Sequence, residues 1–246
     1  MRRRFFVENF ESDSAVIRGE TAEHLGRVLR AEPGQLYELS DGQRVWLAKI
    51  ERVAIPKRGD SSIEFSLVEP VASQEPSLVL HLLVSLIKFD RFEWCLEKAT
   101  ELGVSEIVPV LAARSDKPLA AAASKRHGRW QKIAAESAQQ SRRLRPPVLK
   151  DLLPAEKAFA AYSSAACNIL LSERPGAPPL IQAAQSAASP PNVAALAIGP
   201  EGGWTDAELA AGRAADFVEV SLGENILRAE TAVIAALAVM RFALAP

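Results

Sequence analysis

The sequence predicts an α/β protein with two domains: a small β-rich domain over residues 1–72 and a mostly parallel sheet covered by helices over residues 73–246. Two patterns lead to this prediction. The first 72 residues alternate apolar and polar side chains between short turns, as half-buried strands do. The rest of the chain alternates continuous apolar runs with segments of helical spacing, which favours parallel strands connected by helices.

The N-terminal domain is predicted to be a small barrel or sandwich. Asp41 and Gly42 separate two strand-like runs and suit a two-residue type I′ hairpin turn, in which φ is positive. Thr21 is expected to cap a short helix over residues 22–29. The expected strands are residues 5–7, 15–18, 35–40, 44–53 and 62–71.

A polar segment with Pro76, residues 72–77, is predicted to link the two domains. The run that follows is almost entirely apolar, as a strand buried on both faces should be. Gly103 is expected to end the first helix, and Thr205 and Glu208 form a capping box that opens a later one. The expected strands are residues 78–86, 107–112, 168–171, 193–198 and 217–220, and the expected helices are 89–102, 120–141, 180–187, a helix after Thr205, and 230–243.

Charge is distributed unevenly along a chain whose net charge is only −1. Residues 114–150 hold ten Lys or Arg and two acidic residues, whereas residues 151–246 hold five basic and ten acidic residues. The basic segment is either a solvated helix face or a surface for a polyanion. Its arginines cluster after residue 141, and clustered Arg near Trp130 suits phosphate contacts and base stacking.

The two cysteines, Cys95 and Cys167, match neither a zinc motif nor a disulfide framework, and we expect buried, reduced thiols in a cytoplasmic protein. The basic start of the chain is followed by acidic residues, so it does not read as a signal peptide. The apolar run 232–240 is too short to span a bilayer.

Two glycine-bearing loops, residues 199–203 and 221–231, each follow a predicted strand and lead into a predicted helix. Loops at the carboxyl ends of parallel strands build ligand sites, and glycines let the backbone approach a ligand closely. The first loop alone could be a plain turn, since it matches neither a dinucleotide fingerprint nor a P-loop. Arg228 and Glu230 lead an otherwise apolar helix, either as a local ion pair or as catalytic groups.

Together these stretches resemble the RsmE-type 16S rRNA uridine-N3 methyltransferases of the SPOUT (α/β-knot) superfamily. The resemblance runs through residues 3–7, 24–30, 98–104, 114–115, 129–133, 140–141, 199–203 and 222–232. It implies a PUA-like barrel followed by a trefoil-knotted SPOUT domain that dimerises. It also implies S-adenosyl-L-methionine as cofactor, small-subunit ribosomal RNA as substrate, and neither metal nor membrane. The rival hypotheses are a SPOUT methyltransferase acting on tRNA or a ribose 2′-hydroxyl, and a non-enzymatic RNA-binding module.

The resemblance also implies site residues. The catalytic set is Arg228, which would stabilise charge on the uracil, Glu230, which would orient Arg228 or relay the proton, and Arg114. The RNA-binding set is Arg2, Arg3, Arg4, Arg27, Arg30, Arg142, Arg143 and Arg145. The cofactor-binding set is Leu171, Glu173, Ile198, Gly199, Pro200, Glu201, Gly202, Gly203, Ser221, Leu222, Gly223, Asn225, Ile226, Leu227 and Thr231.

Three further expectations concern particular positions. Asn225 stands where the family usually has Arg, which shifts the expected catalytic role to Arg228. A side chain at Gly202 is expected to enter the cofactor pocket. The last helix is apolar on all sides, so we expect a homodimer in which Val233, Leu237 or Met240 crosses the interface.

Overall fold

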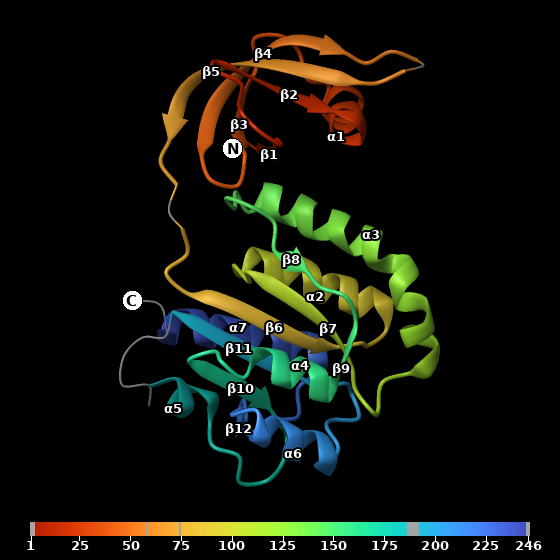
Figure 1. Cartoon of the computed structure of the whole chain (residues 1–246), viewed down its shortest axis with the longest axis vertical. Coiled ribbons are helices and arrows are strands. Elements are labelled where there is room, and N and C mark those ends of the chain that lie inside the picture. The colour runs from red at the N-terminus through yellow and green to blue at the C-terminus, as the bar shows by residue number, and fades with distance from the viewer. Residues whose placement is uncertain (1–2, 58, 74, 186–191, 245–246) are drawn as a thin grey trace. The chain divides into compact units, whose positions relative to one another are not determined.

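The structure, a computed structural model, describes residues 3–57, 59–73, 75–185 and 192–244 (Figure 1). The chain divides into two compact units. The first comprises Met1–Glu75 together with Ala138–Pro146, and the second comprises Pro76–Ser137 together with Pro147–Pro246. The short segment Ala138–Pro146 therefore groups with the N-terminal unit, although it lies inside the predicted second domain.

Within the described part of the first unit, five strands form one curled sheet in the order β1-β3-β4-β5-β2 (Figure 1). β1 and β3 are parallel and the other pairs are antiparallel. Apolar side chains from alternate positions, such as Leu39, Ile50 and Phe65, fill its core. The strands confirm the predicted ones with small shifts at their ends: β1 (Arg4–Phe6), β2 (Ser14–Arg18), β3 (Leu36–Ser40), β4 (Val45–Ala54) and β5 (Ser62–Val71).

The helix of this unit differs from the prediction. α1 (Gly19–Glu23) starts three residues earlier than expected and continues directly into a π-helix, η1 (His24–Val28). Thr21 therefore lies inside the helix and is not its cap, and the N-cap residue Arg18 makes no side-chain capping bond. Short π-helical segments are rare and often mark functional sites.

The hairpin between β3 and β4 also differs from the predicted type I′ turn. Gly42 has a φ of +85°, but no neighbour in the turn has a positive φ. The Asp41 carboxylate closes the turn by accepting the backbone N–H groups of Gln43 (2.9 Å) and Arg44 (2.7 Å). The side chain of Asp41 thus satisfies these two N–H donors, which a type I′ turn would pair with other acceptors.

The second unit is built on a parallel sheet, as predicted. In its described residues the strand order is β12-β10-β11-β6-β7-β8, and β9 also pairs with β7. Each of these pairs is parallel. The strands are β6 (Val79–Ser85), β7 (Glu106–Leu111), β8 (Val148–Leu149), β9 (Leu153–Pro154), β10 (Cys167–Leu171), β11 (Val193–Ile198) and β12 (Val218–Val220).

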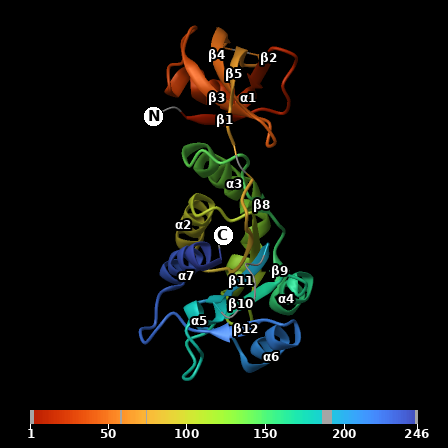
Figure 2. The same ribbon diagram turned by 90° about the vertical axis from the view of Figure 1, so that its left-hand side faces the viewer.

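Helices cover both faces of this sheet (Figure 2). Side chains of α2, α3, α5 and α7 share one core with Leu82 and Leu196. Side chains of α4 and α6 share the other core with Leu83 and Ala197, the next residues along the same strands. The helices are α2 (Phe89–Glu101), α3 (Lys117–Gln140), α4 (Ala155–Tyr162), α5 (Leu180–Gln185), α6 (Asp206–Ala214) and α7 (Ala229–Leu244).

Two predicted helix boundaries are confirmed by their geometry. Gly103 follows α2 with a φ of +84°, and Thr205 and Glu208 form the reciprocal capping box at the start of α6.

Sequence reasoning missed α4, β8 and β9. The two strands are only two residues long, which is too short for a recognisable pattern. The predicted end of α5 and the loop after it fall on residues 186–191, outside the described residues. Within the described part of the chain, no helix has the length and apolar character needed to cross a bilayer.

Candidate functional site

The carboxyl ends of β10, β11 and β12 lie side by side, because these three strands are neighbours in a parallel sheet. The loops that follow them enclose a pocket of about 850 Å³. This volume lies within the range of about 300–1,000 Å³ that is typical of small-molecule sites. The floor is apolar, with Leu171, Ile198 and Leu222, and charged side chains stand around it. The predicted pocket of two glycine loops therefore forms, and a third loop, residues 172–179, completes it.

Most of the predicted cofactor residues line this pocket. The exceptions are Gly202 and Thr231. A Cβ on Gly202 would lie 3.3 Å from Arg114, which lines the pocket, so a side chain there would press on Arg114, and its entry into the pocket stays a prediction. Sequence reasoning missed the lining residues Ser172, Arg174, Pro175, Gly176, Ala177, Pro179, Trp204, Asp206, Leu209, Glu224, Ala229 and Ala232.

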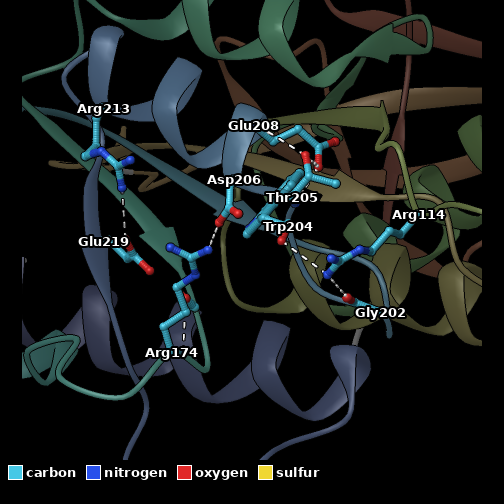
Figure 3. A network of polar contacts seen from close by, with 10 residues as sticks. Arg114, Arg174, Gly202, Trp204, Thr205, Asp206, Glu208, Arg213 and Glu219 are labelled. Carbon is cyan, nitrogen blue, oxygen red and sulfur yellow. Dashed lines mark hydrogen bonds and ion pairs between the residues drawn. The ribbon is translucent and has the colours of Figure 1, made fainter.

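The first glycine loop is held in place by the loop after β7 (Figure 3). Nη1 of Arg114 donates to the carbonyl oxygens of Gly202 (2.6 Å) and Trp204 (3.3 Å). The buried Glu208 carboxylate accepts the N–H of Ala113 at 2.7 Å as well as that of Thr205 at 2.8 Å. Arg114, predicted as catalytic, lines the pocket and also fixes its backbone.

A second pair of charges lies at the edge of the pocket. Arg174 of the third loop forms an ion pair with Asp206 in the first turn of α6 (Figure 3). Both residues line the pocket. The side chains of Arg174 and Asp206 are 48% and 87% exposed, so this ion pair contributes little to stability. Its main effect is to link the third loop to the start of α6.

Arg228 lines the pocket directly before α7. Its side chain is exposed, and the structure gives it no ion pair or side-chain hydrogen bond with any described residue. A cation at a helix N-terminus faces the positive end of the helix dipole, an unfavourable position. Helix stability therefore does not explain Arg228, whereas a site that stabilises negative charge does.

Glu230 makes no described ion pair or hydrogen bond with Arg228, so its predicted orienting role finds no support, whereas its alternative role, relaying the proton, stays a prediction. It is absent from the pocket lining, and its Oε1 lies 3.6 Å from Nη1 of Arg91 in α2. The same Arg91 nitrogen lies 3.6 Å from Oε1 of Glu201 in the first glycine loop. Burial and, secondarily, the Glu230 carboxylate raise the pKa of the nearby Cys95 thiol to about 12, so Cys95 is an inert thiol, as predicted.

Sequence reasoning missed Arg91. The signal was its place three residues into the helix that follows the buried strand β6. Because β6 pairs with β11, the start of α2 lies near the loop that follows β11. The sequence alone does not show that these two segments are neighbours, because the strand order must be known first.

Two arginines predicted to bind RNA have a structural partner within the first unit. Arg4 is buried, and its Nε and Nη2 donate to Oε2 of Glu38 at 3.1 and 2.9 Å. Arg142 also pairs with Glu38. Burial favours protonated Glu38, but the hydrogen bonds from Arg142 and Arg4 outweigh it and lower the pKa of this carboxyl. We therefore correct the prediction for the buried Arg4, whereas Arg142, whose side chain is 39% exposed, stays a predicted RNA contact. Both arginines tie the Ala138–Pro146 segment to the sheet.

The remaining arginines of the set differ in their surroundings. Arg27 and Arg30 are exposed, at η1 and just after it, and Arg3 is exposed before β1. Arg145 donates to the Gly42 carbonyl and pairs with Glu75, and Arg143 is half-buried. Arg2 lies outside the described residues. Trp130 is 1% exposed and packs against Phe89 and Phe92, so the predicted base stacking on it is wrong.

Among the residues that the structure describes, no group of three or more His, Cys, Asp or Glu side chains gathers as a metal site would require. The pocket instead offers backbone groups from three loops and side chains of both charges. This set suits an organic ligand that carries charges of both signs.

Comparisons with known proteins agree with this geometry. The RNA methyltransferase domain family matches residues 74–241. The ribosomal RNA small subunit methyltransferase E of Synechocystis is 35% identical over 218 residues, covering 87% of this chain and 68% of the relative. That of Bacillus subtilis is 29% identical, covering 98% and 96%.

Solved structures of similar proteins superpose over nearly the whole chain. The methyltransferase E of Neisseria gonorrhoeae bound to S-adenosyl methionine has a TM-score of 0.85 at 28% identity, with 98% of each chain covered. A putative methyltransferase from Legionella pneumophila in complex with the same cofactor has a TM-score of 0.81 at 27% identity, covering 99% and 98%. The predicted fold class, a PUA-like barrel followed by a SPOUT domain, is confirmed.

Proposed function

Because the chain belongs to the ribosomal RNA small subunit methyltransferase E family, we propose that it transfers a methyl group from S-adenosyl-L-methionine to N3 of a uridine in 16S ribosomal RNA. The observation that supports this most directly is the pocket of three loops at the carboxyl edge of the parallel sheet. The test is mass spectrometry of ribosomal RNA nucleosides from cells that lack the protein. Loss of 3-methyluridine supports the proposal, whereas loss of a tRNA nucleoside or of a 2′-O-methyl group contradicts it.

The residues of the pocket fit the cofactor. S-adenosyl-L-methionine combines an adenosine with an amino-acid end and a sulfonium, and it supplies an electrophilic methyl group. An apolar floor suits the adenine, and Gly203, with a φ of +67°, opens the backbone at the first loop. Glu173, Glu201 and Glu224 also line the pocket and favour a cationic ligand.

We propose that Arg228 stabilises charge on the uracil. N3 of uridine carries a proton and becomes a good nucleophile only as that proton passes to solvent water, when negative charge spreads onto O2 and O4. A cation placed beforehand next to these oxygens favours that change. Arg228 is suited to this because it faces the pocket and has no competing anion among the described residues.

We propose that RNA phosphates bind Arg27 and Arg30 of the first unit. N3 lies on the Watson–Crick edge, so the target uridine must be unpaired or flipped, and the protein must hold the RNA through its backbone. Both arginines are exposed beside a π-helix. Arg3, Arg143 and Arg145 remain part of the proposed surface.

Replacing Arg27 and Arg30 with Ala is expected to weaken RNA binding and to flatten its salt dependence, by roughly one unit of log–log slope for each phosphate that the protein no longer neutralises. Fluorescence anisotropy with a labelled 16S RNA fragment at several salt concentrations measures both. The matched control is Arg44→Ala with Arg52→Ala, exposed arginines of the same unit outside η1 that pair with Asp41 and Glu64, as Arg27 pairs with Glu23. Equal losses in both double variants would mean that only the total charge matters.

We propose that α7 forms a homodimer through its exposed side. Val233, Leu237 and Met240 are fully buried in the protomer's own core, so the prediction that they cross an interface is wrong. Phe242 on the same helix is 90% exposed. The half-exposed Ile234 and Ala238 precede it at four-residue spacing, so α7 keeps an apolar stripe that the protomer leaves uncovered, as a helix that contacts another chain does.

Phe242→Glu is expected to shift the protein from dimer to monomer without unfolding it, because the side chain makes almost no contact inside the protomer. Sedimentation equilibrium at micromolar concentration measures the mass. Val68→Glu, at a residue 52% exposed on β5, is the control that adds the same charge elsewhere. A monomeric wild-type protein would refute the dimer.

The cytoplasm, where ribosomes assemble, is the proposed place of action.

A further inference from the structure

Arg91 lies where the first glycine loop meets the start of α7. Its Nη1 is 3.6 Å from Oε1 of Glu201 and 3.6 Å from Oε1 of Glu230. These carboxylates belong to the loop after β11 and to the first turn of α7, which are separate segments of the same pocket wall. One guanidinium therefore connects two elements that have no other described ion pair between them.

The two carboxylates differ in their surroundings. The side chain of Glu201 is 47% exposed, whereas that of Glu230 is 15% exposed. Oε2 of Glu230 is buried and has no hydrogen-bond partner among the described residues. Arg91 is thus the cation that compensates a mostly buried carboxylate, and removing one partner of such a pair costs more than breaking a surface pair.

The connection ends at residues that reach the ligand. Glu201 itself lines the pocket, and Arg228 and Ala229 line it directly before Glu230. Arg91 does not line the pocket and does not touch its contents. Any effect of Arg91 on the ligand must pass through the placement of these neighbours.

We propose that Arg91 is a positioning residue that couples the first glycine loop to the start of α7 and thereby sets the affinity for S-adenosyl-L-methionine. The inference rests on the proposed cofactor pocket and adds a residue outside it. Without Arg91, the first glycine loop and the start of α7 lose the cation that both of them contact. These two segments must then become ordered when the ligand binds. Ordering on binding lowers affinity.

The experiment is isothermal titration calorimetry of the full-length protein with S-adenosyl-L-methionine. Arg91→Met keeps most of the aliphatic stem and removes the charged guanidinium, and it is expected to weaken binding roughly tenfold, equivalent to about 1.4 kcal/mol. Arg91→Lys is expected to restore most of the affinity. Both contacts are ion pairs at 3.6 Å and not aligned hydrogen bonds, so an ammonium point charge can serve both carboxylates.

The matched control is Arg129→Met, which removes an exposed arginine that pairs with Glu93 of the same helix α2. It should leave the cofactor Kd unchanged. If wild-type protein does not bind the cofactor, the proposed function fails. If the wild-type protein, Arg129→Met and Arg91→Met all bind the cofactor with the same Kd, the positioning role of Arg91 is overturned and the proposed function stands.

A double-mutant cycle separates positioning from a general loss of structure. Glu201→Gln should weaken binding in the wild-type background and have little further effect in Arg91→Met, because the coupled pair is already broken. An equal effect in both backgrounds would mean that Glu201 acts on the ligand directly, which overturns the proposal. If Arg91→Met does not fold, the same cycle is run with Arg91→Gln, which also removes the charge and keeps a polar side chain, and Glu201→Gln should again have little further effect in that background.

Discussion

Replacing Arg228 with Ala is expected to slow methyl transfer in a single turnover on the order of a hundredfold, the usual effect of losing one donor that stabilises developing charge. Arg228 lines the pocket, is exposed, and has no described anionic partner. Its loss should therefore change neither the fold nor the loops around it. Cofactor affinity should stay close to that of the wild-type protein.

Rapid-quench measurement with a 16S RNA fragment and saturating cofactor gives the transfer rate, and calorimetry gives the affinity. Arg213→Ala is the matched control, because Arg213, in the last turn of α6, pairs with Glu219 of β12 and does not line the pocket (Figure 3). A near-normal rate in Arg228→Ala would assign the charge to another cation. Arg114 is a weaker candidate, since its Nη1 is already bonded to two carbonyl oxygens.

The sequence predicted the pocket because its signals are local. Gly203 and Gly223 have positive φ values. Gly203 lies in the loop after β11 and Gly223 in the loop after β12, and both strands were predicted from their apolar side chains. Strand ends and glycines can be read residue by residue, and the rule for parallel sheets brings them together. The same reasoning placed Arg228 at the pocket.

The partners of charged residues could not be predicted in this way. Glu230 pairs with Arg91 across a long separation in sequence, and Glu38 pairs with Arg142 across 104 residues. Clustered arginines look alike in sequence whether they face a phosphate or a carboxylate of the same chain. Only the fold shows that Arg4 and Arg142 share the carboxylate of Glu38.

The apolar last helix shows the same limit. Val233, Leu237 and Met240 form an obvious stripe, but the stripe faces the core of the protomer. Phe242 lies off this stripe and is the exposed residue. Asn225, where the resemblance predicts Arg, lines the pocket together with Arg114, Arg174 and Arg228, so cationic side chains remain around it.

Gly203→Val is expected to weaken cofactor binding by about ten- to a hundredfold, because backbone strain of about 1–3 kcal/mol has to be relieved by moving the loop. Gly203 has a φ of +67°, a conformation in which a β-branched residue is a genuine outlier. A Cβ there would also lie 3.2 Å from Oε1 of Glu173, another residue of the pocket lining. The turn closed by the Gly203 N–H and the Pro200 carbonyl would have to open, and the loop would move.

Gly34→Val is the matched control for this change. Gly34 has a φ of +89° in the first unit, and no atom lies within 4 Å of its expected Cβ, so the variant carries the same kind of backbone strain away from the pocket. Calorimetry with S-adenosyl-L-methionine should show the loss in Gly203→Val alone, while thermal melts show a similar destabilisation in both variants. Equal cofactor affinity in the two would mean that the first glycine loop does not touch the ligand, and the pocket would have to be assigned to the loops after β10 and β12.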